Sequence, residues 1–227
     1  MREQLQMNDS HNFITHSASR RRFLLAAGTG AVATLLAACG LVSEPPSNFK
    51  ATDITGAGWP RGFELTDHTG RFRTLADFRG KVVLAFFGYT NCPDACPLAL
   101  SEMAQVVKQL GPDGDKVQGL FITVDPKRDT PERLASYVPA FNPSFLGLRG
   151  TQDEVERVKN EFKIYSSAPD ASKGSHLGHG AEKGPYMVDH STGIFIFDTE
   201  GRARLYVSAN DRSVAAMVHD VKLLLKQ

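Results

Sequence analysis

The chain has 227 residues, of which 41% are hydrophobic, enough to bury one sizeable core. Its 26 lysines and arginines balance 25 aspartates and glutamates, and no basic stripe with interleaved aromatic residues is present, which argues against a nucleic-acid partner. Three cysteines are too few for a scaffold held together by disulfides.

The first 38 residues have the pattern of an export signal. Arg20, Arg21 and Arg22 precede Phe23, and an uncharged run rich in Ala, Leu and Gly follows. The arginines and the residues around them resemble a twin-arginine signal. The alternative is an uncleaved membrane anchor, but the run from Phe23 to Ala38 falls short of the roughly 20 residues that a span needs.

A lipid anchor is the expectation for the end of this signal. Leu36-Ala37-Ala38-Cys39 resembles a bacterial lipoprotein box, in which Cys39 becomes the lipidated first residue of the mature chain. We expect residues 1–38 to be the signal, residues 39–55 a flexible tether, and residues 56–227 one folded domain. Its expected location is the periplasmic or extracytoplasmic face of a bacterial membrane.

The folded part alternates between strand and helix patterns. The residues predict a hairpin over 63–74, buried strands over 81–87 and 117–124, helices over 98–110, 130–137 and 151–162, short strands over 145–148, 186–188, 193–198 and 202–207, and a last helix capped by Asp211 or Ser213. This order predicts an α/β fold with a central sheet flanked by helices. The order suits a thioredoxin-like fold with an added N-terminal hairpin.

Cys92 and Cys96 occupy the junction between the strand at 81–87 and the helix at 98–110. Two cysteines four residues apart at a helix start are expected on one face, with Cβ atoms roughly 5–6 Å apart. The helix N-terminus should favour their thiolates. Three interpretations are open: buried structural cysteines, a pair for thiol–disulfide exchange, and a metal site. Thiolates are soft ligands that suit Cu(I), but two of them leave the ion short of a ligand.

His190 is the best candidate for the third ligand. It lies just before the strongly apolar strand at 193–198, in a loop that the fold could bring beside the cysteines. Its alternative role is that of a turn histidine bonded to the backbone. His176 and His179 are rival donors in a glycine-containing loop, where a surface feature or an auxiliary metal-capture role is the expectation.

Three segments resemble the signature segments of the Sco/SenC family. They are residues 88–97, which contain both cysteines, residues 124–131, which begin Val-Asp-Pro, and residues 188–191, which contain His190. The resemblance covers about residue 56 to the C-terminus. It implies a thioredoxin-like copper protein that helps to assemble the binuclear copper centre of cytochrome c oxidase. Copper would be held by Cys92, Cys96 and His190, with Asp125 as an outer-shell or weak ligand.

The resemblance implies transfer of copper rather than enzymatic turnover. The chain would take Cu(I) from a copper donor chaperone and pass it to the copper-centre subunit of the oxidase, and Cu(II) could be accepted with a further oxygen ligand. A Cys92–Cys96 disulfide would abolish binding. Reduction of the oxidase's copper-ligand cysteines is open as a second role. A thiol–disulfide oxidoreductase and a copper or redox sensor are the alternatives.

Overall fold

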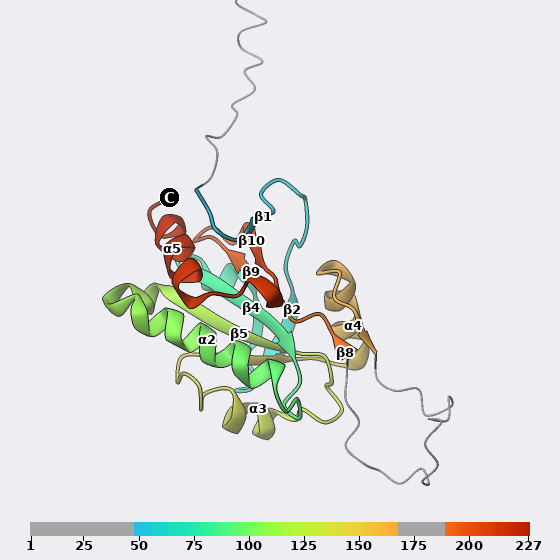
Figure 1. The fold of residues 1–227 in the computed structure, drawn as a ribbon. Coiled ribbons are helices and arrows are strands. Elements are labelled where there is room, and N and C mark those ends of the chain that lie inside the picture. The colour runs from blue at the N-terminus through green and yellow to red at the C-terminus, as the bar shows by residue number, and fades with distance from the viewer. Residues whose placement is uncertain (1–47, 168–188) are drawn as a thin grey trace, which may run out of the picture. The chain divides into compact units, whose positions relative to one another are not determined.

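The structure is a computed structural model, in which the chain forms two units, Met1–Ser47 and Asn48–Gln227. The structure describes residues 48–167 and 189–227 of the second unit (Figure 1). Cys39, His176, His179 and the predicted strand at 186–188 lie outside the described residues.

A single eight-stranded sheet forms the centre of the folded unit, in the order β1-β10-β9-β4-β5-β6-β2-β3. The strands are β1 (Thr52–Asp53), β2 (Glu64–Asp67), β3 (Phe72–Thr74), β4 (Val82–Gly88), β5 (Val117–Thr123), β6 (Leu146–Arg149), β9 (Ile194–Phe197) and β10 (Ala203–Val207). The three central strands β4, β5 and β6 run parallel, and β9 is antiparallel to β4. The predicted hairpin is β2–β3, at one edge of the sheet.

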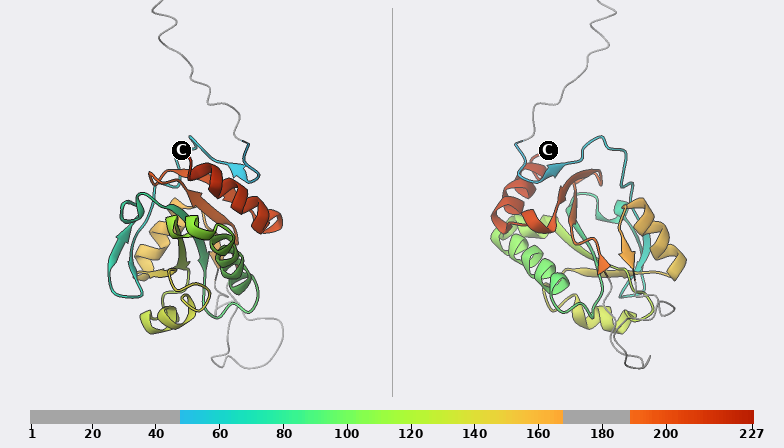
Figure 2. Two further views of the ribbon diagram at one scale, coloured as in Figure 1. Left: turned by 90° about the vertical axis from the view of Figure 1, so that its left-hand side faces the viewer. Right: turned by 45° about the vertical axis from the view of Figure 1, so that its right-hand side comes forward.

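In the described residues, four α-helices cover the two faces of the sheet: α2 (Ala95–Gln109), α3 (Pro131–Tyr137), α4 (Gln152–Glu161) and α5 (Val214–Leu224). Figure 2 shows α2 and α5 side by side on one face of the sheet. Because Tyr137 of α3 packs against Phe121, which shares the face of Phe86, α3 lies on that same face, and α4 covers the other. The predicted α/β class, with helices on both faces of a central sheet, is therefore confirmed. Short 3-10 turns lie at Leu75–Phe78, Gly111–Lys116 and Ala209–Asp211.

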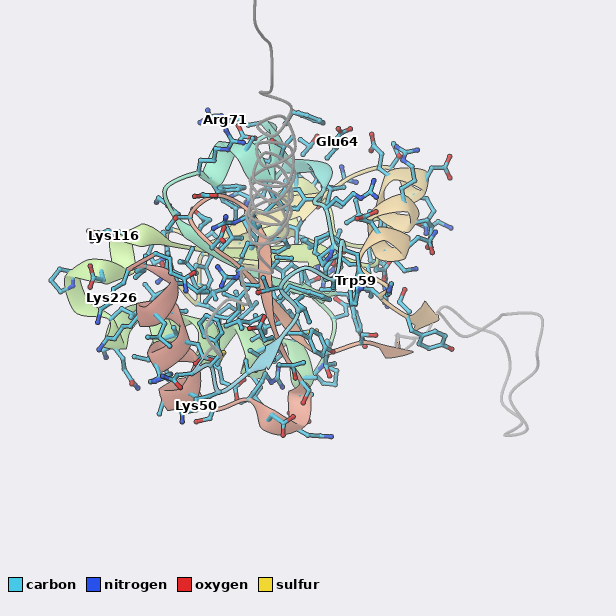
Figure 3. The ribbon with its side chains drawn as sticks, turned by 90° about the horizontal axis from the view of Figure 1, so that it is seen from above. Lys50, Trp59, Glu64, Arg71, Lys116 and Lys226 are labelled. Atoms are coloured by element: carbon cyan, nitrogen blue, oxygen red, sulfur yellow. The ribbon has the colours of Figure 1, made fainter. Side chains whose placement is uncertain are left out.

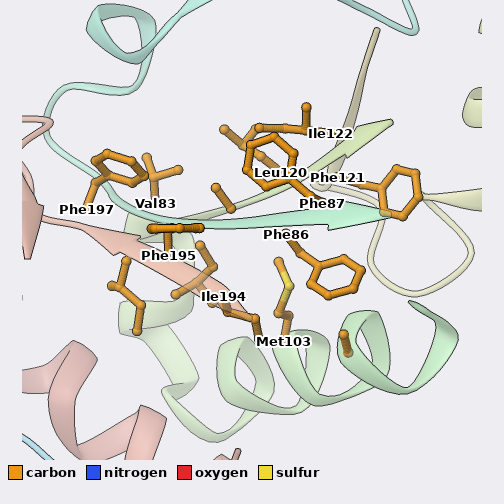
Figure 4. Close-up of a cluster of buried hydrophobic side chains, with 14 of the residues drawn as sticks. Val83, Phe86, Phe87, Met103, Leu120, Phe121, Ile122, Ile194, Phe195 and Phe197 are labelled. Atoms are coloured by element: carbon orange, nitrogen blue, oxygen red, sulfur yellow. The ribbon is translucent and has the colours of Figure 1, made fainter. Parts of the chain in front are cut away.

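The core lies on both sides of β4, all of whose residues are buried. Because successive strand residues point to opposite faces, Phe86 and Phe87 separate (Figure 4). Phe86 lies on the face where α2 packs, with its ring centroid 6.3 Å from that of Phe121. Phe87 packs on the other face, with its ring centroid 4.9 Å from that of Phe162, the residue that follows α4. This continuous apolar strand positions the residues at its carboxyl end, where the cysteines follow.

Local signals place the helix starts where the sequence predicts them. Thr130 caps α3 by accepting a hydrogen bond from the Arg133 amide, and Pro131 is the first helical residue. Thr151 and Glu154 form a capping box at α4. Ser213, rather than Asp211, caps α5.

The folded unit begins earlier than the sequence predicts. A tether is expected as far as residue 55, but Thr52–Asp53 form β1 and pair with β10. The backbone amides of Lys50 and Ala51 donate to the buried carboxylate of Asp220, at 2.9 Å for each amide. Figure 3 labels Lys50 close to α5, which carries Asp220. A long-range contact of this kind has no local sequence signal.

Asp67 ends β2 and organises the turn to β3. Its buried carboxylate accepts hydrogen bonds from the amide of Thr69 at 2.8 Å and from the amide of Arg71 at 3.1 Å. The Arg73 guanidinium donates to it at 2.8 Å. Burial by itself would raise the pKa of Asp67, but the hydrogen bonds from Thr69, Arg73 and Arg71 together lower it to about 2.

The Asp67 turn should make the protein less stable in acid. Because the folded-state pKa lies below the unfolded one, the stabilisation is complete above about pH 5 and is lost as the pH falls through the folded pKa. We expect the hydrogen bonds to the Asp67 carboxylate to contribute about 2 kcal/mol to the free energy of unfolding at neutral pH. Urea unfolding at a series of pH values should show this loss, and Asp67→Asn should flatten the acid slope. An unchanged slope in the variant would contradict this role.

Candidate metal centre

The sheet topology brings the three signature segments to one end. Gly88, the last residue of β4, pairs with Thr123, the last residue of the parallel strand β5. The cysteine segment follows β4 and Asp125 follows β5, so both leave the sheet at its carboxyl edge. Since β9 runs antiparallel to β4 and Ile194 pairs with Phe86, the chain enters β9 at this same edge.

His190 therefore belongs to a segment that reaches the cysteine end of β4. Its backbone forms the short strand β8 (Asp189–His190), which pairs with β7 (Ser166–Ser167), and His190 is opposite Ser166. The Ser191 amide also donates to the Tyr165 carbonyl at 3.0 Å. This small two-stranded sheet is absent from the sequence prediction. The side chain of His190 lies outside those that the structure describes.

The two cysteines do not share a helix face, contrary to the prediction. The helix α2 begins at Ala95, so Cys96 lies in its first turn, whereas Cys92 lies in the preceding turn, which the Cys92 amide closes on the Tyr89 carbonyl at 3.2 Å. Cys92 and Cys96 are not joined by a disulfide, and Cys92 is half-buried while Cys96 is fully buried. The Cys96 and Cys92 side chains interact directly. The turn before α2, rather than a shared helix face, therefore brings the two sulfurs together.

The electrostatics of Cys96 also differ from the prediction. Burial raises the pKa of the Cys96 thiol, and this effect outweighs the hydrogen bond from the Tyr89 backbone, which lowers it. The neighbouring Cys92 and the carboxylate of Asp129 raise it further. The expected thiolate at the helix start is therefore wrong for Cys96, because desolvation outweighs the helix dipole. A metal that binds here has to displace the thiol proton.

Asp125 is buried and already paired. Its carboxylate accepts a hydrogen bond from the Arg128 guanidinium, whose central carbon lies 5.4 Å from the centre of the Tyr89 ring. Its own amide donates to the Thr123 hydroxyl at 3.0 Å. Among the side chains that the structure describes, which do not include that of His190, no three His, Cys, Asp or Glu groups could together hold a metal. A direct ligand role for Asp125 would require it to exchange Arg128 for the ion.

Asp129 is a functional candidate that sequence reasoning missed. Its buried carboxylate accepts from the Thr90 amide at 3.2 Å, the Thr90 hydroxyl at 2.6 Å and the Thr123 hydroxyl at 2.6 Å. It thereby ties the start of the cysteine segment to the end of β5. Burial raises the pKa of Asp129, although the hydrogen bonds from Thr123 and Thr90 oppose the rise. The one sequence signal for Asp129 was its position just before Thr130, the cap residue of α3.

Two cysteines that form no disulfide, at a strand-to-helix junction of a mixed, helix-covered sheet, define a thioredoxin-like protein. Within that class, the family model SCO1/SenC matches residues 54–226. The chain belongs to the SCO1/SenC family.

Individual relatives agree with this assignment. The bovine protein SCO2 homolog, mitochondrial, is 44% identical over 148 residues, covering 64% of this chain and 52% of the relative. Copper-bound ScoI of Bradyrhizobium japonicum is 34% identical with a TM-score of 0.61, over 72% of this chain and 97% of that structure. Copper-bound yeast Sco1 is 33% identical with a TM-score of 0.63, over 73% of this chain and 87% of that structure. The chain spans about half the length of the mitochondrial relatives, 52% of the bovine and 50% of the human protein.

These relatives correct the predicted location. The bovine, human and mouse SCO2 homologs that the chain resembles are mitochondrial proteins, so a lipid-anchored place on the extracytoplasmic face of a bacterial membrane is not supported. In the part of the chain that the structure describes, no helix has the length and apolar character to cross a membrane. Cys39, on which the anchor was predicted, is outside that part.

Proposed function

We propose that this chain binds copper through Cys92, Cys96 and His190 and delivers it to the copper-centre subunit of cytochrome c oxidase. The observation that carries the proposal is the position of the Cys92–Cys96 pair, which forms no disulfide, at the edge of the sheet where the His190 segment also enters. Copper-bound ScoI and yeast Sco1 have the same fold. A protein that donates copper to this chain is the second partner.

The donor set fits copper in its reduced state. Two thiolates and an imidazole are soft and borderline ligands, which suit Cu(I) and disfavour hard ions such as Mg²⁺ and Ca²⁺. Bound copper supplies no reaction in this role, because it is the cargo. Asp125 would act outside the ligands by holding Arg128 beside Tyr89, which belongs to the cysteine segment.

The residues perform two tasks in the transfer. The Cys96 thiol, protonated while it is buried and metal-free, gives up its proton when copper binds. Cys92 is half-exposed, so a ligand of the acceptor can approach the ion from its side and displace the donors one by one. Oxidation of the two thiols to a disulfide removes two electrons and two protons and leaves no thiolate to bind copper.

The same asymmetry supports reduction of the oxidase's cysteines as a second role. The half-exposed Cys92, as thiolate, could attack a disulfide of the partner and form a mixed disulfide. The buried Cys96 would then attack the Cys92 sulfur, which releases the partner as a dithiol and leaves a Cys92–Cys96 disulfide. Each such exchange passes two electrons from this pair to the partner.

The test is anaerobic titration of the reduced protein with Cu(I) against a competing chelator. We expect one ion per chain, and at least tenfold weaker binding in His190→Ala, because one of three ligands is lost. His68→Ala is the control, because His68 accepts a hydrogen bond from the Gly147 amide at 3.0 Å and lies on the β2–β3 hairpin. Equal affinity of His190→Ala and the wild type would refute the three-ligand site. Disulfide reduction that persists in His190→Ala would then favour the second role.

A further inference from the structure

Tyr137, the last residue of α3, carries a buried hydroxyl that the proposed site has not used. Its ring packs edge-on against Phe121, with centroids 5.8 Å apart, and against Phe141, with centroids 5.3 Å apart. The hydroxyl oxygen is buried and has no hydrogen-bond partner among the residues that the structure describes. Buried polar atoms without a partner are few in native proteins, and each calls for an explanation.

Phe121 connects Tyr137 to the space beside the thiol pair. A methyl group placed on Gly88 would lie 2.8 Å from the Cys96 sulfur and 2.8 Å from the edge of the Phe121 ring, so these two groups line the same small space. Phe121 in turn contacts the Tyr137 ring. Burial raises the pKa of Tyr137, and the nearby groups Cys96, Cys92 and Asp129 raise it further. All three groups are thus near enough to act on the phenol electrostatically.

The neighbouring acceptor is already occupied. The Asp129 carboxylate accepts hydrogen bonds from the hydroxyls of Thr90 and Thr123. A tyrosine phenol is protonated at neutral pH, so Tyr137 can act as a donor. The Cys96 sulfur is a weak acceptor as a neutral thiol, but as a thiolate it becomes a strong one.

We propose that Tyr137 is a positioning residue of the thiol pair, whose hydroxyl donates a hydrogen bond to the Cys96 sulfur when that sulfur is a thiolate bound to Cu(I). This inference rests on the proposed copper site and adds a residue to it. The hydroxyl without a partner in the metal-free protein gains one in the loaded protein. Such outer hydrogen bonds orient metal ligands and tune their affinity.

The test is Tyr137→Phe, which removes only the hydroxyl and keeps the ring contacts with Phe121 and Phe141. We expect Cu(I) to bind about tenfold more weakly than to the wild type. The reduced, metal-free variant should unfold at the same urea concentration or a higher one, because the lost hydroxyl had no partner. In the Cu(II)-loaded protein, the sulfur-to-copper charge-transfer band should move to longer wavelength, since the sulfur loses a hydrogen bond.

Tyr165→Phe is the matched control, because Tyr165 is 66% exposed and its backbone, not its hydroxyl, bonds to Ser191. It should leave affinity, stability and spectrum unchanged. If Tyr137→Phe binds Cu(I) as the wild type does while His190→Ala binds weakly, the Tyr137 inference fails and the copper site stands. If the wild type itself takes up no Cu(I), the proposed function fails. A Tyr137→Phe variant destabilised without metal would show a merely structural hydroxyl and would also overturn the inference.

Discussion

Asp129→Ala is expected to lower the free energy of unfolding by about 4 kcal/mol, since it leaves buried donors unpaired and opens a cavity. The Thr90 amide and the Thr90 and Thr123 hydroxyls all lose their acceptor. Water cannot replace the carboxylate easily, because Asp129 is only 1% exposed. Urea unfolding of the reduced protein measures the loss, and an unchanged slope with denaturant would show that the unfolded state is the same.

The change at Asp129 should also reach the cysteines. Thr90 begins the segment that leads to Cys92, so its release from Asp129 should loosen the turn that holds Cys92 against Cys96. We expect faster alkylation of the Cys96 thiol in Asp129→Ala than in the wild type.

Two variants serve as controls for Asp129→Ala. Asp129→Asn keeps one oxygen for the Thr90 amide and should lose about half as much stability. Asp113→Ala removes an exposed carboxylate in a surface ion pair with Lys116 and should change neither property measurably. If Asp129→Ala behaved like Asp113→Ala, the carboxylate would not be what holds the cysteine segment.

Gly88→Ala is expected to cost about 3 kcal/mol of stability and to displace the Cys96 thiol. The added methyl group would lie 2.8 Å from the Cys96 sulfur, 2.8 Å from Phe121 and 2.9 Å from Phe86. All three neighbours are fully buried, so none can retreat into solvent. The glycine is therefore required by space rather than by backbone conformation, because its φ is not positive.

Gly88→Ala should weaken Cu(I) binding as well as lower the stability measured by urea unfolding, because the added methyl group clashes with Cys96, a proposed ligand. Gly147→Ala in β6 is the matched control. Its methyl group would meet Leu134 at 3.0 Å and Val138 at 3.2 Å, a milder crowding away from the thiols. It should cost less stability and leave Cu(I) binding intact. Equal losses of affinity at the two glycines would contradict a specific effect on Cys96.

The sequence by itself determined the elements whose signals are local. The continuous apolar run at 81–87 predicted β4, and the cap residues Thr130 and Thr151 predicted the starts of α3 and α4. These features depend on neighbours a few residues away, so composition and spacing are enough to find them. The family was also predictable, since its three signature segments stand intact in the chain, and the family match confirmed it.

Only the tertiary structure decided how the thiols sit in their surroundings. The sequence placed Cys92 and Cys96 on one helix with lowered thiol pKa values, whereas α2 begins after Cys92 and burial raises the pKa of Cys96. Burial depends on what packs over a residue, which spacing along the chain does not reveal.

The long-range partners of the site were decided in the same way. Asp129 reaches Thr90 across 39 positions, and the Phe121 ring links Tyr137 to the space beside Cys96. Their roles arise only when β4, β5 and α3 pack together. Local signals therefore identified the cysteines as the centre of the site, and the packing of the sheet and helices determined which residues hold and surround them.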